Sequence, residues 1–183
     1  MFNNKIYNIL KYYMKILETE IIILTLEKDI LIICILNINN DCNIEKNIET
    51  MIEGINNVYI SYQKLNKKLG LLFDIRQLNR ILPITSIWKI SDFFNSKKDI
   101  TEVIITSTSI ITENNFLLSL IKTFNTFYKN IKPLKFTNDY NEGYNFIINN
   151  CNIDKEIDNK EYKMNNEITK NEITNSINNY TNN

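Results

Sequence analysis

The chain of 183 residues contains no histidine and only three glycines, and each shortage excludes a class of function. Histidine is the commonest general base and zinc ligand, so its absence excludes Ser-His-Asp and Cys-His hydrolases. Three glycines cannot supply a glycine-rich phosphate-binding loop, and neither G-x-x-x-x-G-K-[ST] nor G-x-G-x-x-G occurs. We therefore expect no enzymatic activity, no metal and no cofactor.

The chain also has few cysteines and no net charge. Cys34, Cys42 and Cys151 form an odd number without a C-x-x-C pair, which argues against a disulfide framework or a zinc site. Lys+Arg equals Asp+Glu at 21 each, so no global field attracts nucleic acid or an anionic membrane. The apolar stretch 21–36 carries EKD in its middle and predicts a hairpin, not a transmembrane segment. We expect an intracellular, cytoplasmic protein, in an infected host cell if it is viral.

Apolar periodicity predicts strands and helices in the first half of the chain. The β-branched runs 20–26 and 30–38 flank EKD and predict two antiparallel strands. Residues 1–17 fit either a helix or a further strand. From Ile44 to Leu69, apolar steps of three and four predict one long helix that Gly70 ends. Packing of this helix on its own sheet is favoured over self-association.

In the second half, strands and helices alternate. We predict strands at 71–75 and 102–106, a helix starting at Pro83 with the core face Ile84, Ile87, Trp88 and Phe94, a helix from Thr112 to about Tyr128, the strand PLKFT and a closing helix NDYNEGYNFIINN. The result is an α/β fold, a mixed sheet of about five strands with about four helices, the later strands being parallel and the N-terminal hairpin antiparallel.

Composition changes beyond Cys151, where Asn, Lys, Glu and Asp dominate. Such a segment buries too little apolar area to offset the entropy of ordering it. The sequence thus predicts one domain over 1–150 and a disordered, Asn-rich tail over 151–183. Folding of the tail on a partner stays open.

Candidate contact residues lie at the predicted ends of two strands. Asp74 and Arg76 follow LLF, and strand C-terminal ends are the usual place for ligand or partner contact in an α/β sheet. In the alternative interpretation, Asp74 accepts loop N–H groups or caps the next helix while Arg76 covers apolar surface. The remaining candidates on this rim are the hydroxyl residues Ser86, Thr106, Ser107, Thr108 and Ser109.

The chain resembles a STAS-type domain, the fold of bacterial anti-sigma-factor antagonists, in its element order and in the stretches LLFDIRQL, VIITSTS and KPLKFTNDYNEGYNFI. It resembles in particular small STAS or lipid-transfer-like proteins of giant viruses and protists. The resemblance covers residues 12–150. It implies a regulatory module that binds a protein partner. In the antagonists a loop serine is phosphorylated; Thr85 and Ser86 lie near the corresponding position but out of register, in ILPITS.

Two other functions stay open on the sequence alone. A lipid or small-ligand carrier would need a hollow lined by residues such as Phe116, Leu120 and Phe124. A homo-oligomeric structural protein of a virus, for example a homodimer, would use the helix at 44–69.

Overall fold

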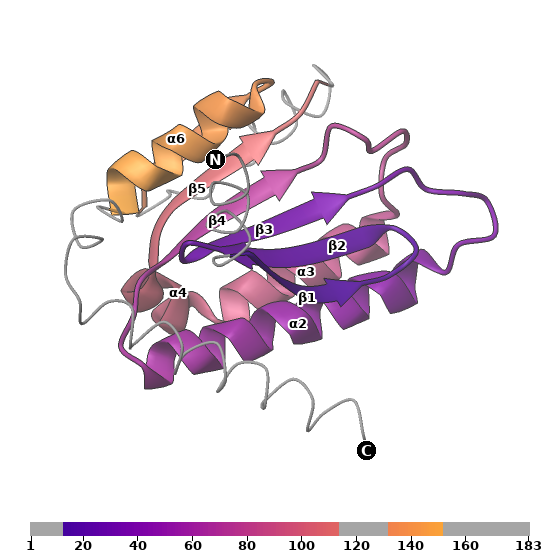
Figure 1. The fold of residues 1–183 in the computed structure, drawn as a ribbon. Helices are drawn as coiled ribbons and strands as arrows, with labels where there is room; N and C mark the ends of the chain where they lie inside the picture. Colours follow the sequence, from indigo (N-terminus) through magenta and orange to yellow (C-terminus); the bar gives the residue numbers. More distant parts are fainter. Residues whose placement is uncertain (1–12, 114–131, 152–183) are drawn as a thin grey trace, which may run out of the picture.

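The computed structural model describes residues 13–113 and 132–151 (Figure 1). In chain order the elements are β1 (Tyr13–Glu18), β2 (Ile22–Glu27), β3 (Ile30–Ile35), α2 (Ile44–Lys64), β4 (Leu69–Asp74), α3 (Ile84–Ser96), α4 (Lys98–Ile104), β5 (Ile105–Ile111), β6 (Leu134–Thr137) and α6 (Tyr140–Cys151). The predicted tail and the predicted helix after Thr112 lie outside the described residues. No helix within the described residues is both long and apolar enough to cross a membrane.

The described strands form one mixed sheet in the order β1-β2-β3-β4-β5-β6. The pairs β1–β2 and β2–β3 are antiparallel, whereas β3–β4, β4–β5 and β5–β6 are parallel. The predicted hairpin and the predicted parallel pairing are therefore confirmed, with β1 as an additional edge strand. Helices α2, α3 and α4 lie on one face of the sheet and α6 lies on the other (Figure 1).

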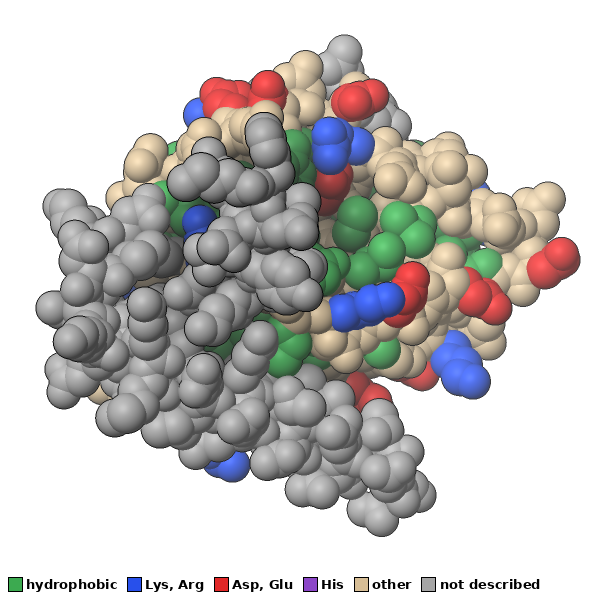
Figure 2. All heavy atoms as spheres, viewed as in Figure 1, with side chains coloured by type: hydrophobic (Ala, Val, Ile, Leu, Met, Phe, Trp, Pro, Cys, Tyr) green, Lys and Arg blue, Asp and Glu red, His purple; other side chains and the backbone are tan. Residues whose placement is uncertain are grey.

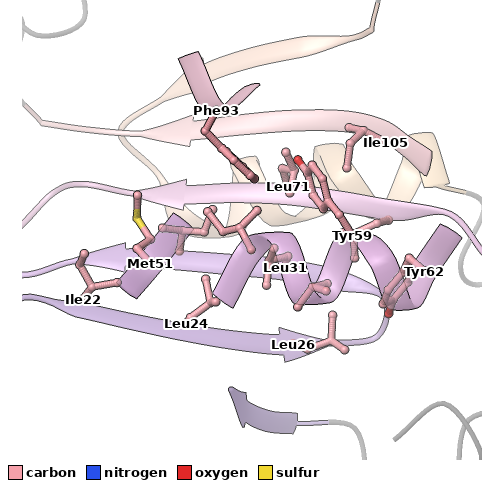
Figure 3. Packing of buried hydrophobic residues seen from close by; sticks show 14 of the residues in the cluster. Ile22, Leu24, Leu26, Leu31, Met51, Tyr59, Tyr62, Leu71, Phe93 and Ile105 are labelled. Atoms are coloured by element: carbon pink, nitrogen blue, oxygen red, sulfur yellow. The ribbon is translucent and has the colours of Figure 1, made fainter. Parts of the chain in front are cut away.

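The larger core lies between the sheet and α2. Leu24 and Leu31 point from their strands toward the helix, where they meet Met51, Tyr59 and other buried residues (Figure 3). Phe93 closes this core from α3, and its ring lies 6.1 Å from that of Tyr59. The predicted packing of this helix on its own sheet is confirmed, so its apolar face is unavailable for self-association.

A β-bulge determines which residues of β1 lie on each face of the sheet. The register with β2 shifts between Lys15 and Leu17, which leaves one extra residue in β1. As a result Met14 and Leu17 both pack against the larger core, although they are three residues apart. Lys15 and Glu18 share the opposite face, where they form an exposed ion pair. The described part of the segment 1–17, which fitted two interpretations, is thus a strand.

Gly70 does not end the long helix. Helix α2 ends at Lys64, and Asn66 with φ 50° takes the left-handed conformation that terminates a helix. Gly70 lies inside β4 and donates its N–H to the carbonyl of Asp29 at 2.9 Å. A Cβ at this position would overlap Cγ2 of Ile147 in α6, so the glycine permits close packing of α6 on the sheet.

Two predictions in the second half were wrong. Residues 98–104 form the short helix α4, so the strand begins at Ile105 and not at Glu102. The predicted core face of α3 is wrong for two of its members, because Trp88 is 62% and Ile84 55% exposed, whereas Phe94 does pack against the core. The helix instead buries Ser86 and Phe93, half a turn away.

We predict that Gly70→Ala lowers the free energy of unfolding by about 1–3 kcal/mol, because the new methyl group collides with Ile147. No glycine in the described residues has positive φ, so a change of backbone strain cannot cause the loss. Urea unfolding measures the effect. Combining Gly70→Ala with Ile147→Ala should give less than the sum of the two losses.

Gly54→Ala is the matched control. Its Cβ would meet the ends of two leucine side chains, Leu24 Cδ2 at 2.9 Å and Leu17 Cδ2 at 3.6 Å, and alanine favours the helix in which Gly54 lies. We expect this variant to be at least as stable as the wild type. Equal stability of the two alanine variants would contradict the packing role of Gly70.

Candidate functional site

One row of paired residues crosses the sheet where the parallel strands end. Ile23 pairs with Cys34, Cys34 with Asp74, Asp74 with Ile111, and Ile111 with Thr137. The row continues onto the edge strand β1, where the exposed Glu18 pairs with Ile23, and Asp74 is its one buried charged residue among the described strands. The row lies on the face of the sheet that α6 covers in part. Figure 2 shows hydrophobic side chains exposed on this face, over the region where β2 and β3 lie in Figure 1.

Asp74 is neutralised by Arg76, its neighbour two positions along the chain. Arg76 Nε donates to Asp74 Oδ1 at 2.9 Å and Nη2 donates to Oδ2 at 2.7 Å, which is a bidentate pair. The backbone N–H of Arg76 also donates to Oδ1, at 3.3 Å. The hydrogen bond to Asp74 raises the pKa of the guanidinium above its ordinary value. A buried carboxylate thereby fixes the first residues of the loop 75–83.

The guanidinium of Arg76 also lies over the ring of Tyr140 at the start of α6, 5.5 Å from its centroid. Tyr140 stacks on Tyr144, with ring centroids 6.0 Å apart and an interplanar angle of 19°. The Tyr144 hydroxyl donates to Glu27 Oε1 at 3.0 Å. These contacts link the end of β4 to α6 and to the end of β2. Burial, followed by the nearby Glu27, raises the pKa of Tyr140 to about 12.

Cys34 belongs to the same row and is partly buried. Its pKa is raised first by burial and then by the negative charge of Asp74, so the thiol stays protonated at neutral pH. A protonated thiol is a poor nucleophile. Among residues 13–113 and 132–151, no group of three His, Cys, Asp or Glu side chains is placed to hold a metal ion.

The candidate rim residues are only partly brought together. Thr106, Ser107, Thr108 and Ser109 lie inside β5 and not at its end, because the strand runs from Ile105 to Ile111. Gly70, at the start of β4, pairs with Ser107, whereas Asp74 at its end pairs with Ile111. The four hydroxyl residues thus precede the level of Asp74, and Ser107 and Ser109 are fully buried. Of the predicted set, only Asp74 and Arg76 contact each other at the rim.

The two hydroxyls at the start of α3 differ in accessibility. Ser86 is fully buried, and its Oγ has no hydrogen-bond partner among the described residues. Thr85 is exposed and donates to Glu45 Oε1 at 3.1 Å. Thr85 is therefore the accessible hydroxyl of the pair. The residues proposed to line a carrier cavity, Phe116, Leu120 and Phe124, lie outside the described residues.

Sequence reasoning missed an apolar surface on α3, which covers the other face of the sheet and follows this site along the chain. Ile81, Ile84 and Trp88 are 52%, 55% and 62% exposed, and we call them the α3 apolar surface. They extend from the end of the loop 75–83 over the first turns of α3. The spacing of apolar residues by three and four positions indicates which residues share one face of a helix. It does not indicate whether that face turns toward the core or toward solvent.

The loop that carries Ile81 is held in place by polar contacts to the neighbouring loop. Asn79 Oδ1 accepts from the backbone N–H of Ile38 at 3.0 Å. Arg80 Nη2 donates to the carbonyl of Asn39 at 2.9 Å. Together with the Asp74 pair, these hydrogen bonds fix the loop at both ends. The α3 apolar surface is thus presented by an anchored segment.

We predict that Tyr140→Phe reduces the loss of stability at high pH. The folded-state pKa of Tyr140 is raised to about 12 from an unfolded value of 10.0, so between these values the unfolded chain loses the proton first. Stability linked to Tyr140 is therefore complete below pH 10 and declines up to about pH 12, by on the order of 1 kcal/mol, since solvent screening of this partly exposed side chain reduces the effect.

The measurement is the difference in unfolding free energy between wild type and Tyr140→Phe, followed by urea titration across this pH range. Tyr13→Phe is the control, because Tyr13 is nearly half exposed. If the difference between wild type and Tyr140→Phe did not change with pH, the partial burial of Tyr140 as the cause of its raised pKa would be refuted.

Comparisons with known proteins give little beyond the architecture. No protein-family model matches the sequence, and no curated protein matches it. Among solved structures, the fold is similar to that of an uncharacterized protein from the DUF3478 family with a SpoIIAA-like fold, from Shewanella loihica PV-4. The similarity has a TM-score of 0.48 at 13% sequence identity and covers 72% of this chain and 98% of that chain.

Proposed function

We propose that the protein is a non-catalytic interaction module that binds a protein partner through the α3 apolar surface, with the Asp74–Arg76 pair holding the loop 75–83 that leads into α3. The α3 apolar surface carries the proposal. Three neighbouring large apolar side chains, each more than half exposed, are unusual on a surface without a partner. Tryptophan is the residue type most enriched among those that dominate binding energy.

The proposed role of the rim is to hold the contact surface in shape. Arg76 pairs with the buried carboxylate of Asp74, and its guanidinium lies over the ring of Tyr140 in α6. These two contacts fix the start of the loop 75–83. A pre-ordered loop loses less conformational entropy on binding than a loop that must first be ordered. This role differs from direct contact with a ligand, because both oxygens of Asp74 are already engaged by Arg76.

The chemistry of the site favours binding over catalysis. The carboxylate of Asp74 is bound by a guanidinium, and the pKa of Cys34 and that of Tyr140 are both raised, which keeps these groups protonated and neutral. A general base or nucleophile requires a group that is ionised or poised near neutral pH. A regulatory role, as the resemblance to STAS domains implies, belongs to this proposal.

We predict that a photo-crosslinking residue at position 81 forms a specific adduct in cells that express the full chain. The adduct should be lost in Trp88→Ser, because the variant removes the central apolar contact while changing an exposed position. The double variant Asp74→Ala plus Arg76→Ala should weaken the adduct, because it releases the loop. Gel mobility and mass spectrometry of the adduct provide the readout.

The matched control is the same crosslinker at position 103, because Val103 is exposed to the same extent as Ile84 but lies on α4. An adduct from position 103 should not respond to Trp88→Ser. The proposal fails if position 81 gives no specific adduct, or if Trp88→Ser leaves its yield unchanged while circular dichroism shows a folded chain.

A further inference from the structure

We infer that the α3 apolar surface binds a second copy of this chain, with the two α3 helices packed antiparallel about a two-fold axis that passes between Ile84 and Trp88. This inference rests on the proposed function, since it names the partner of the same surface. A two-fold dimer uses one patch twice, so the patch must be complementary to itself. The sequence of α3 meets that condition in one register.

The exposed face of α3 is divided into an apolar half and a polar half. Ile84 and Trp88 lie one turn apart in the first half of the helix, and the same face continues with Ser91, Asp92 and Asn95. In an antiparallel pair centred between Ile84 and Trp88, each Ile84 faces the Trp88 of the other copy. The two apolar contacts then form at the centre and the polar residues lie at the rim, as in other protein interfaces.

The small side chains of the polar half leave room for the loop of the other copy. The start of one helix lies beside the end of the other, so the exposed Ile81 approaches Ser91 and Asn95 of the second copy. Neither Ser91 nor Asn95 projects far from a helix. Bulky side chains at the ends of the two helices therefore do not keep Ile84 of one copy from reaching Trp88 of the other.

Charge selects the antiparallel arrangement over a parallel one. Arg80 precedes the helix, and its guanidinium donates only to Asn39 and Asn40 oxygens within the described residues. Asp92 is exposed, lies one turn after Trp88 and forms no ion pair within residues 13–113 and 132–151. Antiparallel packing brings Arg80 of one copy toward Asp92 of the other, twice. Parallel packing would instead place like charges together.

The ammonium group of Lys89, which lies next to Trp88 in the chain, does not extend over the α3 apolar surface. Lys89 is engaged within its own chain, 2.6 Å from Glu49 Oε1 and 3.7 Å from Glu45 Oε2, on the side of α3 that faces α2. The approach of a second α3 therefore breaks no ion pair of the monomer. Because the patch is small, the dissociation constant is expected in the micromolar range.

The first test is sedimentation equilibrium of the full chain from low to high micromolar concentration. We expect a reversible monomer–dimer equilibrium in the wild type, a dimer at least about tenfold weaker in Trp88→Ser and in Ile84→Ser, and no change in the control Val103→Ser. A wild type that stays monomeric at the highest concentration overturns the inference, as does a dimer that Trp88→Ser leaves intact.

The second test examines the register by pairing two complementary variants. Ile84→Glu and Trp88→Lys should each be monomeric alone, because each places a charge against an apolar side chain of the other copy. Mixed together they should form a heterodimer, since the new carboxylate at position 84 of one chain then meets the new ammonium group at position 88 of the other, while the remaining Ile84–Trp88 contact is retained. Absence of a heterodimer between two folded variants overturns the antiparallel register.

The crosslinking experiment separates this inference from the proposed function. If the adduct at position 81 contains two copies of this chain, both hold. An adduct with a different protein, lost in Trp88→Ser, supports the proposed function and overturns the second copy as the partner. Without a Trp88-dependent adduct of either kind, both fail.

Discussion

The parallel pairing of β3 with β4 is the constraint on which the rest of the structure depends. Nearly all residues of both strands are buried, so each face of this pair must be covered. A parallel connection also requires a crossover, and α2 supplies it while it covers one face. The second face is covered by α6, which can lie close because Gly70 has no side chain where Ile147 packs. The pairing thus determines both helical layers.

The same pairing explains why a charged residue is tolerated at the end of β4. Parallel register places Asp74 beside Cys34 and under the start of α6, where water has little access. A buried carboxylate is destabilising unless a cation and hydrogen bonds compensate it. Arg76 provides the cation because the chain leaves the sheet at Ile75 and turns back. The Asp-x-Arg spacing is therefore a structural solution to the end of a buried strand.

Much of the fold could be predicted from the sequence because its strands and helices differ in apolar period. The β-branched runs on either side of the EKD turn have no helical spacing, and the helix that begins at Ile44 has a regular one. The errors arose where one signal has two physical causes. Glycine both terminates helices and permits close approach between elements, and at Gly70 the second cause applies. The helix ends instead at Asn66, whose left-handed backbone is another common terminator.

The location of the hydroxyl-rich segment could not be predicted from local pattern. Serines and threonines commonly finish a strand, yet Ser107 and Ser109 lie within β5 and face α6. Their small size is a packing property, because Gly143 of α6 lies directly against Ser109. The sequence does not reveal which helix approaches which strand. For the same reason Cys34 and Tyr140 could not be placed beside Asp74, since neither register nor helix position is encoded locally.

The exposure of Trp88 follows from the rotational phase of α3 about its axis. Phe93 enters the core, where it contacts Tyr59, and the ring centroid of Phe94 lies 6.1 Å from that of Phe73. These two side chains fix which face of α3 turns inward. Ser86 lies on that face, where its small volume lets the start of α3 approach the core. Trp88 then lies on the opposite side, since two residues rotate a helix by about 200°. Its exposure is a consequence of the packing of α3.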